Sequence, residues 1–210
     1  MTVQTLVAPD ATTQTAQNGH AGEKKWTYEE YLKLPDDGKR YEIIEGVLYV
    51  VNAPTIAHQF AVNRISFYFQ LLSIENDLGT VLTSPIEVHL SEETRPVQPD
   101  VLFVRKERQT ILKPQYCDGA PDLIVEVISP SSIRLDRREK FDAYEQYGVA
   151  EYWLVDLKLR GVEVHKLENG EYVLLGQYTG DELIESTILP DLQIKANSLF
   201  YPTLPVSAQT

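Results

Sequence analysis

The chain has 210 residues, of which 43% are hydrophobic and 24% charged, with a formal net charge of −12 and a pI of about 4.8. These fractions are typical of a soluble globular protein, and the length suits one domain with a full hydrophobic core. The acidic balance counts against a broad basic surface that grips nucleic acid. It leaves room for a nuclease, because carboxylates gathered around metal ions also raise the acidic count.

No apolar run approaches the ~20 residues of a membrane span, so no membrane partner is expected. The first 22 residues lack both the basic start and the apolar centre of a secretory signal. Cys117 is the single cysteine and cannot form an internal disulfide. Its surroundings predict a polar loop with no partner for thiol catalysis. Together these features predict a cytoplasmic protein.

Both ends of the chain differ from its middle. Residues 1–24 are rich in Thr, Gln, Ala and Asn and have no apolar period, which predicts a disordered N-terminal tail. Residues 201–210 resemble them and predict a C-terminal tail. A single folded domain is therefore expected over residues 25–200.

The elements expected between the tails alternate in type. In chain order they are a short helix after Thr27, a hairpin over 41–51, a helix over 57–75, strands over 80–90, 97–104 and 122–128, a helix over 136–147, a strand over 151–156 and a hairpin over 162–175. The apolar residues expected on the helix over 57–75 are Phe60, Ala61, Ile65, Phe67, Tyr68, Leu71 and Leu72. Thr27 with Glu30 forms a capping-box pattern, and Asn169-Gly170 is a strong hairpin signal. The order predicts an α/β fold, a mixed β-sheet flanked by helices with additional β-hairpins.

Glu126 lies inside the most apolar of the expected strands, where an ionised carboxylate needs a partner. Side chains alternate along a strand, so Glu126 shares a face with Ile124 and Ile128. If the strand over 97–104 pairs with it in the right register, Asp100 points the same way, a few ångströms away. Two carboxylates that close repel each other unless a cation neutralises them. Oxygen ligands with partial solvent access suit Mg²⁺ or Mn²⁺.

Lys140 belongs to the helix that follows. Positions 140, 143, 144 and 147 form one stripe, and the other three residues there are Ala143, Tyr144 and Tyr147. A lysine that leads such an apolar and aromatic stripe is expected to face the sheet. Its ammonium should lie within a few ångströms of Glu126, where it could stabilise negative charge during attack on a phosphate. Asp136, one turn earlier, could orient it.

These residues resemble the PD-(D/E)xK nuclease superfamily, and in particular its Uma-type restriction endonucleases. In most of the superfamily the lysine stands two residues after the second acid, but that position is Ile128 here. In the Uma-type branch the next helix supplies it. The similarity spans roughly Trp26 to Phe200. The matching segments are Arg40–Gly46, Pro99-Asp100, Glu126–Ser132, Asp136, Lys140, Tyr144, Gly148-Val149 and Glu151–Asp156.

The resemblance implies a restriction-endonuclease-like fold and Mg²⁺-dependent (or Mn²⁺-dependent) hydrolysis of DNA phosphodiester bonds. Asp100 and Glu126 would be the metal ligands, with the Val127 carbonyl as a third. Lys140 would be the catalytic lysine, and Glu42 would complete the acidic cluster. Many nucleases of this fold dimerise to cut two strands, so analogy points to a homodimer.

Purely structural interpretations remain open for several of these residues. Glu126 could form a structural ion pair with Lys140 or an arginine, and Asp100 alone could cap a turn. Glu45 would face away from Glu42 unless a bulge intervenes. His58 is either a helix-face residue or a metal ligand. The basic cluster of Arg134, Arg137 and Arg138 is either a solvated face or a phosphate contact.

The alternative function is a catalytically silent module that binds nucleic acid or protein on the same fold. The acidic pI and the missing strand lysine favour it. Two facing acids and a facing lysine argue for the enzyme, since a binding module has no need of them.

Overall fold

The computed structural model describes residues 25–51, 53–128 and 132–202. The tail predicted over 1–24 lies outside these residues, and so does the tail predicted over 201–210 apart from Tyr201 and Pro202. Within the described residues, no helix combines the length and apolarity that crossing a membrane requires.

The centre of the fold is a six-stranded mixed sheet in the order β10-β9-β8-β7-β5-β3. The strands are β3 (Gly79–Thr83), β5 (Val101–Arg105), β7 (Leu123–Ile128), β8 (Glu151–Asp156), β9 (Gly161–Glu168) and β10 (Glu171–Thr179). The β7–β8 pair is parallel and the other neighbours are antiparallel. A crossover between parallel strands needs a covering helix, and here it consists of the π-helix η2 (Leu135–Glu139) followed by α3 (Lys140–Gln146).

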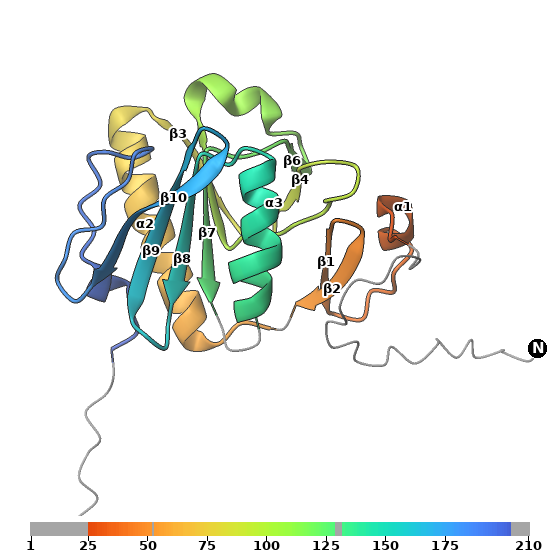
Figure 1. Cartoon of the computed structure of the whole chain (residues 1–210), viewed down its shortest axis with the longest axis horizontal. Coiled ribbons are helices and arrows are strands. Elements are labelled where there is room, and N and C mark those ends of the chain that lie inside the picture. The colour runs from red at the N-terminus through yellow and green to blue at the C-terminus, as the bar shows by residue number, and fades with distance from the viewer. Residues whose placement is uncertain (1–24, 52, 129–131, 203–210) are drawn as a thin grey trace, which may run out of the picture.

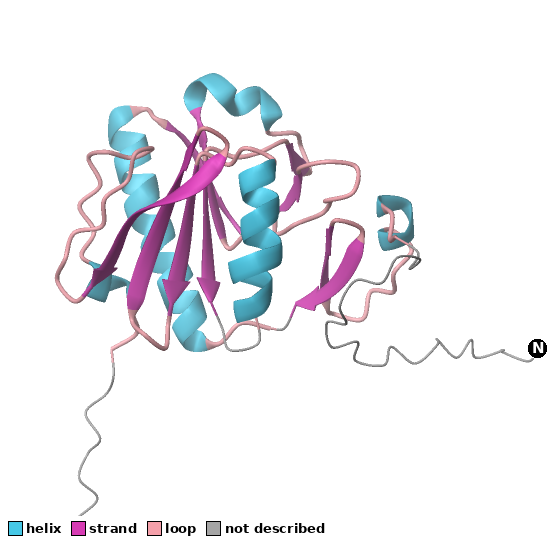
Figure 2. Cartoon of the chain, in the orientation of Figure 1, coloured by secondary structure: helices cyan, strands magenta, loops and turns pink. Residues whose placement is uncertain are grey.

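Two helices cover the two faces of this sheet (Figure 1 and Figure 2). The long helix α2 (Ile56–Asn76) lies behind the sheet in the view, and α3 lies in front. The hairpin of β1 (Arg40–Ile44) and β2 (Val47–Val51) stands beside α3, next to the short helix α1 (Tyr28–Tyr31). The α/β class with a mixed sheet, flanking helices and extra hairpins is confirmed.

The sheet separates two hydrophobic cores, and β7 contributes to both. Leu123, Val125 and Val127 belong to the core under α2. Ile124 and Ile128 belong to the core under α3, which Tyr144 and Tyr152 also fill. The alternation expected along this strand is confirmed, and it directs Glu126 toward α3.

Two predicted strands are corrected by the structure. The strand predicted over 80–90 is two strands in different sheets, β3 and β4 (Glu87–His89), because Pro85 between them has no N–H for a ladder. The strand predicted over 97–104 begins only at Val101, so Asp100 immediately precedes β5 instead of lying within it.

The polar loop predicted around Cys117 is partly ordered in the connection from β5 to β7. It contains the 3₁₀ helix η1 (Lys106–Ile111) and the strand β6 (Tyr116–Asp118), which pairs in parallel with β4. Cys117 is fully buried in β6 and not in a polar loop. Burial raises the pKa of its thiol to about 12, so the thiol stays protonated and packs as a small apolar group.

Helix α2 was predicted at almost its observed length, but its apolar face was wrong in part. Phe67 and Leu71 are exposed, while Phe69 packs against Trp153 in the core at a ring-centroid distance of 5.3 Å. Apolar residues stand on both sides of this helix, so a period of 3.6 alone does not decide which side faces the sheet.

A buried carboxylate of β8 shows what a structural acid looks like in this fold. Glu151 is fully buried, and both of its oxygens accept hydrogen bonds. Oε1 accepts from the Trp153 indole and the Ser186 hydroxyl, and Oε2 accepts from the N–H and hydroxyl of Thr187. Glu151 therefore fixes the segment 186–188 against the sheet.

Replacing Glu151 with Ala should destabilise the fold by roughly 3 kcal/mol or more. Each buried donor left without an acceptor costs about 1–3 kcal/mol. Urea unfolding measures the change, and Glu171→Ala, at an exposed position of β10, is the control, with an expected shift of about 0.5 kcal/mol or less. Equal midpoints for the two variants would contradict the structural role of Glu151.

Candidate active site

The Glu126 carboxylate is buried between the sheet and α3, and it accepts hydrogen bonds from two side chains. It is 3% exposed. Its Oε1 lies 2.9 Å from Nζ of Lys140 and accepts the hydroxyl of Tyr144 at 2.8 Å. The proximity of Lys140 to Glu126 that the sequence predicted is confirmed. The catalytic role of either residue stays a prediction at this point.

Lys140 stands at the centre of a group of carboxylates. Its Nζ is 3.1 Å from Glu42 Oε1 and 3.9 Å from Asp136 Oδ1, in addition to its bond to Glu126. Lys140 is the first residue of α3, and the π-helix η2 precedes it. Because π turns are frequent at functional sites, a π-helix at this point of the crossover agrees with a specialised placement of the lysine.

Glu42 reaches this group from the separate β1–β2 hairpin. Its Oε1 also accepts the backbone N–H of Gln98 at 2.7 Å, which ties the hairpin to the segment before β5. Its Oε2 is buried and has no hydrogen-bond partner among the described residues, although Nζ of Lys140 lies 3.1 Å away. The hairpin thus contributes a carboxylate with acceptor capacity still unused.

Glu45 is not part of this group. It occupies the turn of the hairpin with φ of +50°, followed by Gly46 with φ of +79°, the positive values that a two-residue turn of this kind requires. Its Oε1 accepts from the hydroxyls of Thr94 and Tyr147. Glu45 therefore fastens the hairpin turn to the end of α3, whereas Glu42 contacts Lys140 at the start of that helix.

Asp100 is the residue immediately before β5, and its side chain accepts a hydrogen bond from the backbone of β7. Val101 pairs with Val125, so the register continued by one residue sets Asp100 opposite Glu126. Its Oδ2 accepts the backbone N–H of Val127 at 2.8 Å. The carboxylate thus occupies the place at which a longer β5 would have offered a carbonyl.

His58 approaches the same oxygen from the first turn of α2. Its Nε2 lies 3.1 Å from Asp100 Oδ2, while its Nδ1 is buried and has no hydrogen-bond partner in the described residues. The Thr55 side chain caps the helix by accepting the His58 N–H. The structure therefore brings His58 into the site, and its role there was left open by the sequence.

Negative charge exceeds positive charge in this group, and the titration of its members reflects the excess. Burial raises the pKa of Glu126 well above its usual value, an effect that Lys140 opposes and the neighbouring carboxylates reinforce. Burial also raises the pKa of Asp136 to about 6. Burial alone would lower the pKa of Lys140, but the carboxylates around it raise that pKa well above its usual value. The lysine is therefore charged, and the site retains a demand for further positive charge.

The donors present fit a small divalent cation by their chemistry. Asp100 and Glu126 are oxygen ligands, and Mg²⁺ is commonly held by one or two carboxylates while water and substrate phosphates complete its shell. Oε2 of Glu42, which accepts no hydrogen bond among the described residues, lies 3.1 Å from Nζ of Lys140. Across residues 25–51, 53–128 and 132–202, no three His, Cys, Asp or Glu side chains already converge as a metal cluster. A divalent cation here would therefore have two carboxylate ligands, Asp100 and Glu126, with water and substrate phosphates as its other ligands.

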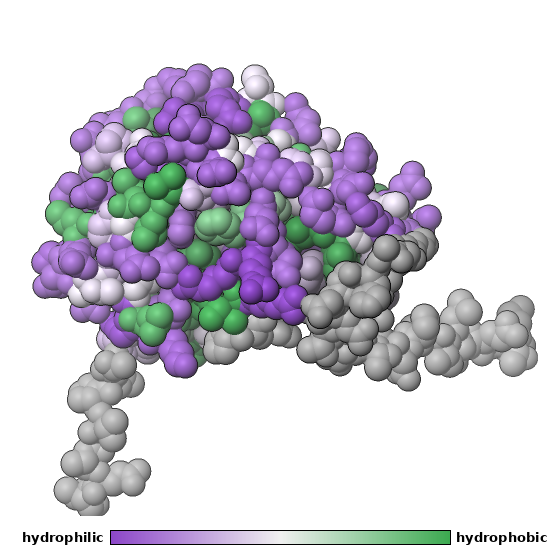
Figure 3. Space-filling model, viewed as in Figure 1, coloured by the Kyte–Doolittle hydropathy of each residue, from purple (hydrophilic) through white to green (hydrophobic). Residues whose placement is uncertain are grey.

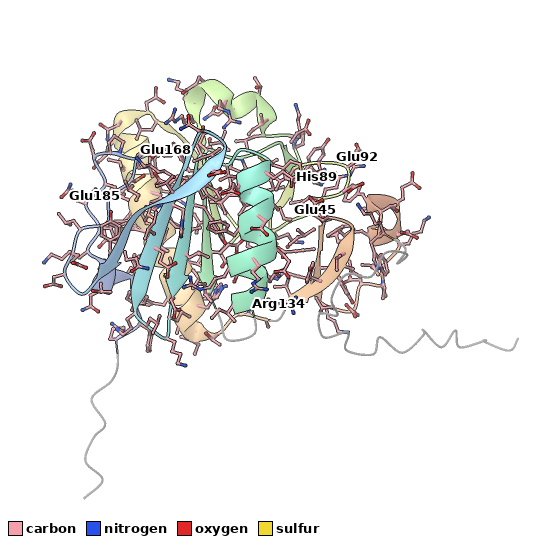
Figure 4. All side chains as sticks on the ribbon, in the orientation of Figure 1. Glu45, His89, Glu92, Arg134, Glu168 and Glu185 are labelled. Atoms are coloured by element: carbon pink, nitrogen blue, oxygen red, sulfur yellow. The ribbon has the colours of Figure 1, made fainter. Side chains whose placement is uncertain are left out.

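The three arginines of the basic cluster, Arg134, Arg137 and Arg138, have different surroundings in the structure. Arg137 forms a two-pronged ion pair with Glu163, at 2.8 Å for both contacts, and is structural. Arg134 is half exposed and lies near the β1–β2 hairpin at the lower end of α3 (Figure 4). Arg138 is exposed, and no described residue pairs with it. The surface around α3 is mostly hydrophilic (Figure 3).

Sequence reasoning did not assign Tyr144 and His58 to this site. Tyr144 was expected in the core, where its ring does lie, but its hydroxyl bonds to Glu126. His58 was ambiguous because nothing local links it to Asp100. A buried tyrosine one turn after a buried lysine was the available signal, since a buried hydroxyl needs a partner.

Comparison with known proteins identifies the family and the fold. A family model described as "Uma2: Putative restriction endonuclease" matches residues 28–197. The uncharacterized protein sll1609 of Synechocystis sp. is 26% identical over 160 residues, which are 74% of this chain and 88% of that protein. A crystal structure of a putative nuclease belonging to DUF820 from Anabaena variabilis superposes with a TM-score of 0.69 at 18% identity, over 83% of this chain and 97% of that one. The last likeness shows the fold.

Replacing Asp136 with Asn should remove part of the pH dependence of stability. The pKa of Asp136 is raised from 3.8 to about 6. A raised carboxyl pKa contributes stability that is present below the unfolded value and is lost as pH rises through the folded value. The wild type should therefore lose stability relative to Asp136→Asn between pH 4 and pH 6. Urea unfolding with EDTA at four pH values tests this, and two parallel stability curves would contradict it.

Proposed function

The chain belongs to the Uma2 family, whose model spans most of its described residues, and we propose that it is a metal-dependent endonuclease that hydrolyses DNA phosphodiester bonds. The observation that carries the proposal is the buried contact of Lys140 with Glu126, at 2.9 Å, beside Asp100. A domain that only binds a partner has no use for a charged lysine held among three carboxylates, because burying ions costs free energy.

Asp100 and Glu126 would hold the cation, and the Val127 carbonyl is the third candidate ligand. The N–H and C=O of one strand residue point to the same edge of a strand. The Val127 N–H is directed at Asp100, so its carbonyl is directed to the same side. Mg²⁺ or Mn²⁺, when bound, would supply a Lewis acid that activates water and neutralises phosphate charge.

The chain's own residues then supply position and charge. Lys140 provides a fixed positive charge for the negative charge that develops on the attacked phosphate. Glu42 and Asp136 hold the lysine in place and keep it protonated. Since Ile128 stands where most of the superfamily has its lysine, Lys140 takes that part from the helix instead of the strand.

The acidic chain needs help to approach DNA, and two exposed arginines are the nearest candidates. Arg134 and Arg138 lie on the segment that leads into Lys140, and Arg138 has no partner among the described residues. Each would contact the phosphate backbone and so contribute affinity without sequence information.

Purified wild-type protein should nick or cut plasmid DNA with Mg²⁺ or Mn²⁺, and Asp100→Asn and Glu126→Gln should reduce cleavage by about 10²-fold or more. Both variants keep the shape of the side chain and lose its charge, which the metal needs. Asp142→Asn, on the exposed side of α3, is the matched control and should cut normally. Gel assays with EDTA as a blank measure the outcome. A wild type that binds DNA but never cuts it would favour the silent binding module.

Lys140→Met should slow cleavage by about 10²-fold while Mn²⁺ binding survives. The loss matches that of one preorganised charge or donor in a transition state. Affinity for the cation should hold, because the change removes a donor to Glu126 and also a positive charge that repels the metal. Single-turnover cleavage and calorimetric Mn²⁺ titration separate the two effects, with Lys113→Met as a surface control. Unchanged cleavage by Lys140→Met would rule out the assignment.

A further inference from the structure

The donors around the two facing carboxylates are distributed unevenly between their oxygens. Oε1 of Glu126 accepts from Lys140 and Tyr144, while Oδ2 of Asp100 accepts from the Val127 N–H and lies 3.1 Å from Nε2 of His58. Among the described residues, no donor reaches Oε2 of Glu126 or Oδ1 of Asp100. Within the part of the chain that the structure describes, each carboxylate therefore has one oxygen with two close polar contacts and one oxygen that no donor reaches.

Two buried carboxylates elsewhere in the fold have contacts on both oxygens. Glu151 has donors on both oxygens, from Trp153 and Ser186 on one and from Thr187 on the other. In Asp122, Oδ2 accepts the Arg105 N–H and Oδ1 pairs with Arg108. Glu151 and Asp122 are thus satisfied on both sides, and the one-sided pattern of two facing carboxylates, Glu126 and Asp100, differs from theirs.

We propose that Tyr144 and His58 are positioning residues of the metal site, each of which fixes one oxygen of a ligand carboxylate and leaves the other to the cation. The inference rests on the proposed metal-dependent function. An oxygen with two donors has its lone pairs engaged, and the carboxylate cannot rotate without losing both bonds. Outer hydrogen bonds of this kind orient metal ligands and tune their affinity.

The simplest structural explanation for Tyr144 is that a buried hydroxyl needs an acceptor. Its neighbours show how this fold meets that need: the hydroxyls of Tyr152 and Tyr172 donate to the backbone carbonyls of Asp136 and Val149. The ring of Tyr144 packs edge-on to Tyr152 at 5.1 Å, within the same aromatic group. Within this group, Tyr144 directs its hydroxyl to a carboxylate of the site.

His58 complements Tyr144 from the other layer of the fold. An ionised carboxylate oxygen can only accept, so the Nε2 of His58, 3.1 Å from Asp100 Oδ2, is the ring nitrogen placed to carry a hydrogen toward it. The capped first turn of α2 fixes the position of this residue. One ligand carboxylate is thus oriented from α3 and the other from α2.

The test compares Mn²⁺ affinity by titration calorimetry in Tyr144→Phe, His58→Leu and His58→Gln. Tyr144→Phe and His58→Leu should bind Mn²⁺ about 10- to 100-fold more weakly, on the scale of losing an outer-shell partner. His58→Gln keeps an N–H at the position of Nε2 and should restore most of the affinity. Tyr172→Phe removes a hydroxyl of the same aromatic group, remote from the carboxylates, and should bind as the wild type does.

Thermal melts in EDTA, run on every variant, separate loss of folding from loss of binding. Wild-type affinity in folded Tyr144→Phe and His58→Leu would overturn the positioning role and leave the nuclease proposal standing. Absence of Mn²⁺ binding in the wild type would overturn the metal-dependent function itself. If His58→Leu does not fold, Tyr144→Phe decides the matter, since it removes a single oxygen atom from a retained ring.

Discussion

The charged lysine buried among carboxylates is the interaction on which the rest of the site depends. Lys140 contacts Glu126 and Glu42 directly and lies near Asp136, and without it these acids would repel one another in a poorly solvated space. The fold bears the desolvation cost of this ion cluster in order to hold several carboxylates together. Under the proposed function, a bound cation would compensate the negative charge that this cluster retains.

Local patterns predicted much of the fold because their physical causes are local. The capping box of Thr27 and Glu30, the turn at Asn169-Gly170 and the alternation along β7 depend on residues within a few positions of one another. The late start of β5 was missed because it depends on which strand becomes its partner, whereas the interruption at Pro85 has a local cause, the missing N–H, that the prediction of one strand did not use. The buried faces of α2 were missed in part because both sides of that helix are apolar.

The candidate site was predictable where a residue contradicted its surroundings. A glutamate in an aliphatic strand and a lysine on an aromatic stripe are conflicts that one sequence can display, and the structure brings both together. Tyr144 and His58 create no such conflict, since a buried tyrosine and a histidine on a helix are both ordinary. Their part in the site depends on the meeting of α2, α3 and the sheet, which only the three-dimensional arrangement reveals.

The bond between Lys140 and Glu42 joins two residues that are 98 positions apart in the sequence. Glu42 lies in the β1–β2 hairpin, and Lys140 begins the helix that follows β7. During synthesis, therefore, Lys140 can compensate the charge of Glu42 only after the crossover helix has left the ribosome. Shorter nascent chains lack the complete cluster, so an unfinished chain cannot assemble the site. The same long-range closure makes assembly of the site one of the later and more cooperative events of folding, since distant contacts carry the largest loop-closure entropy.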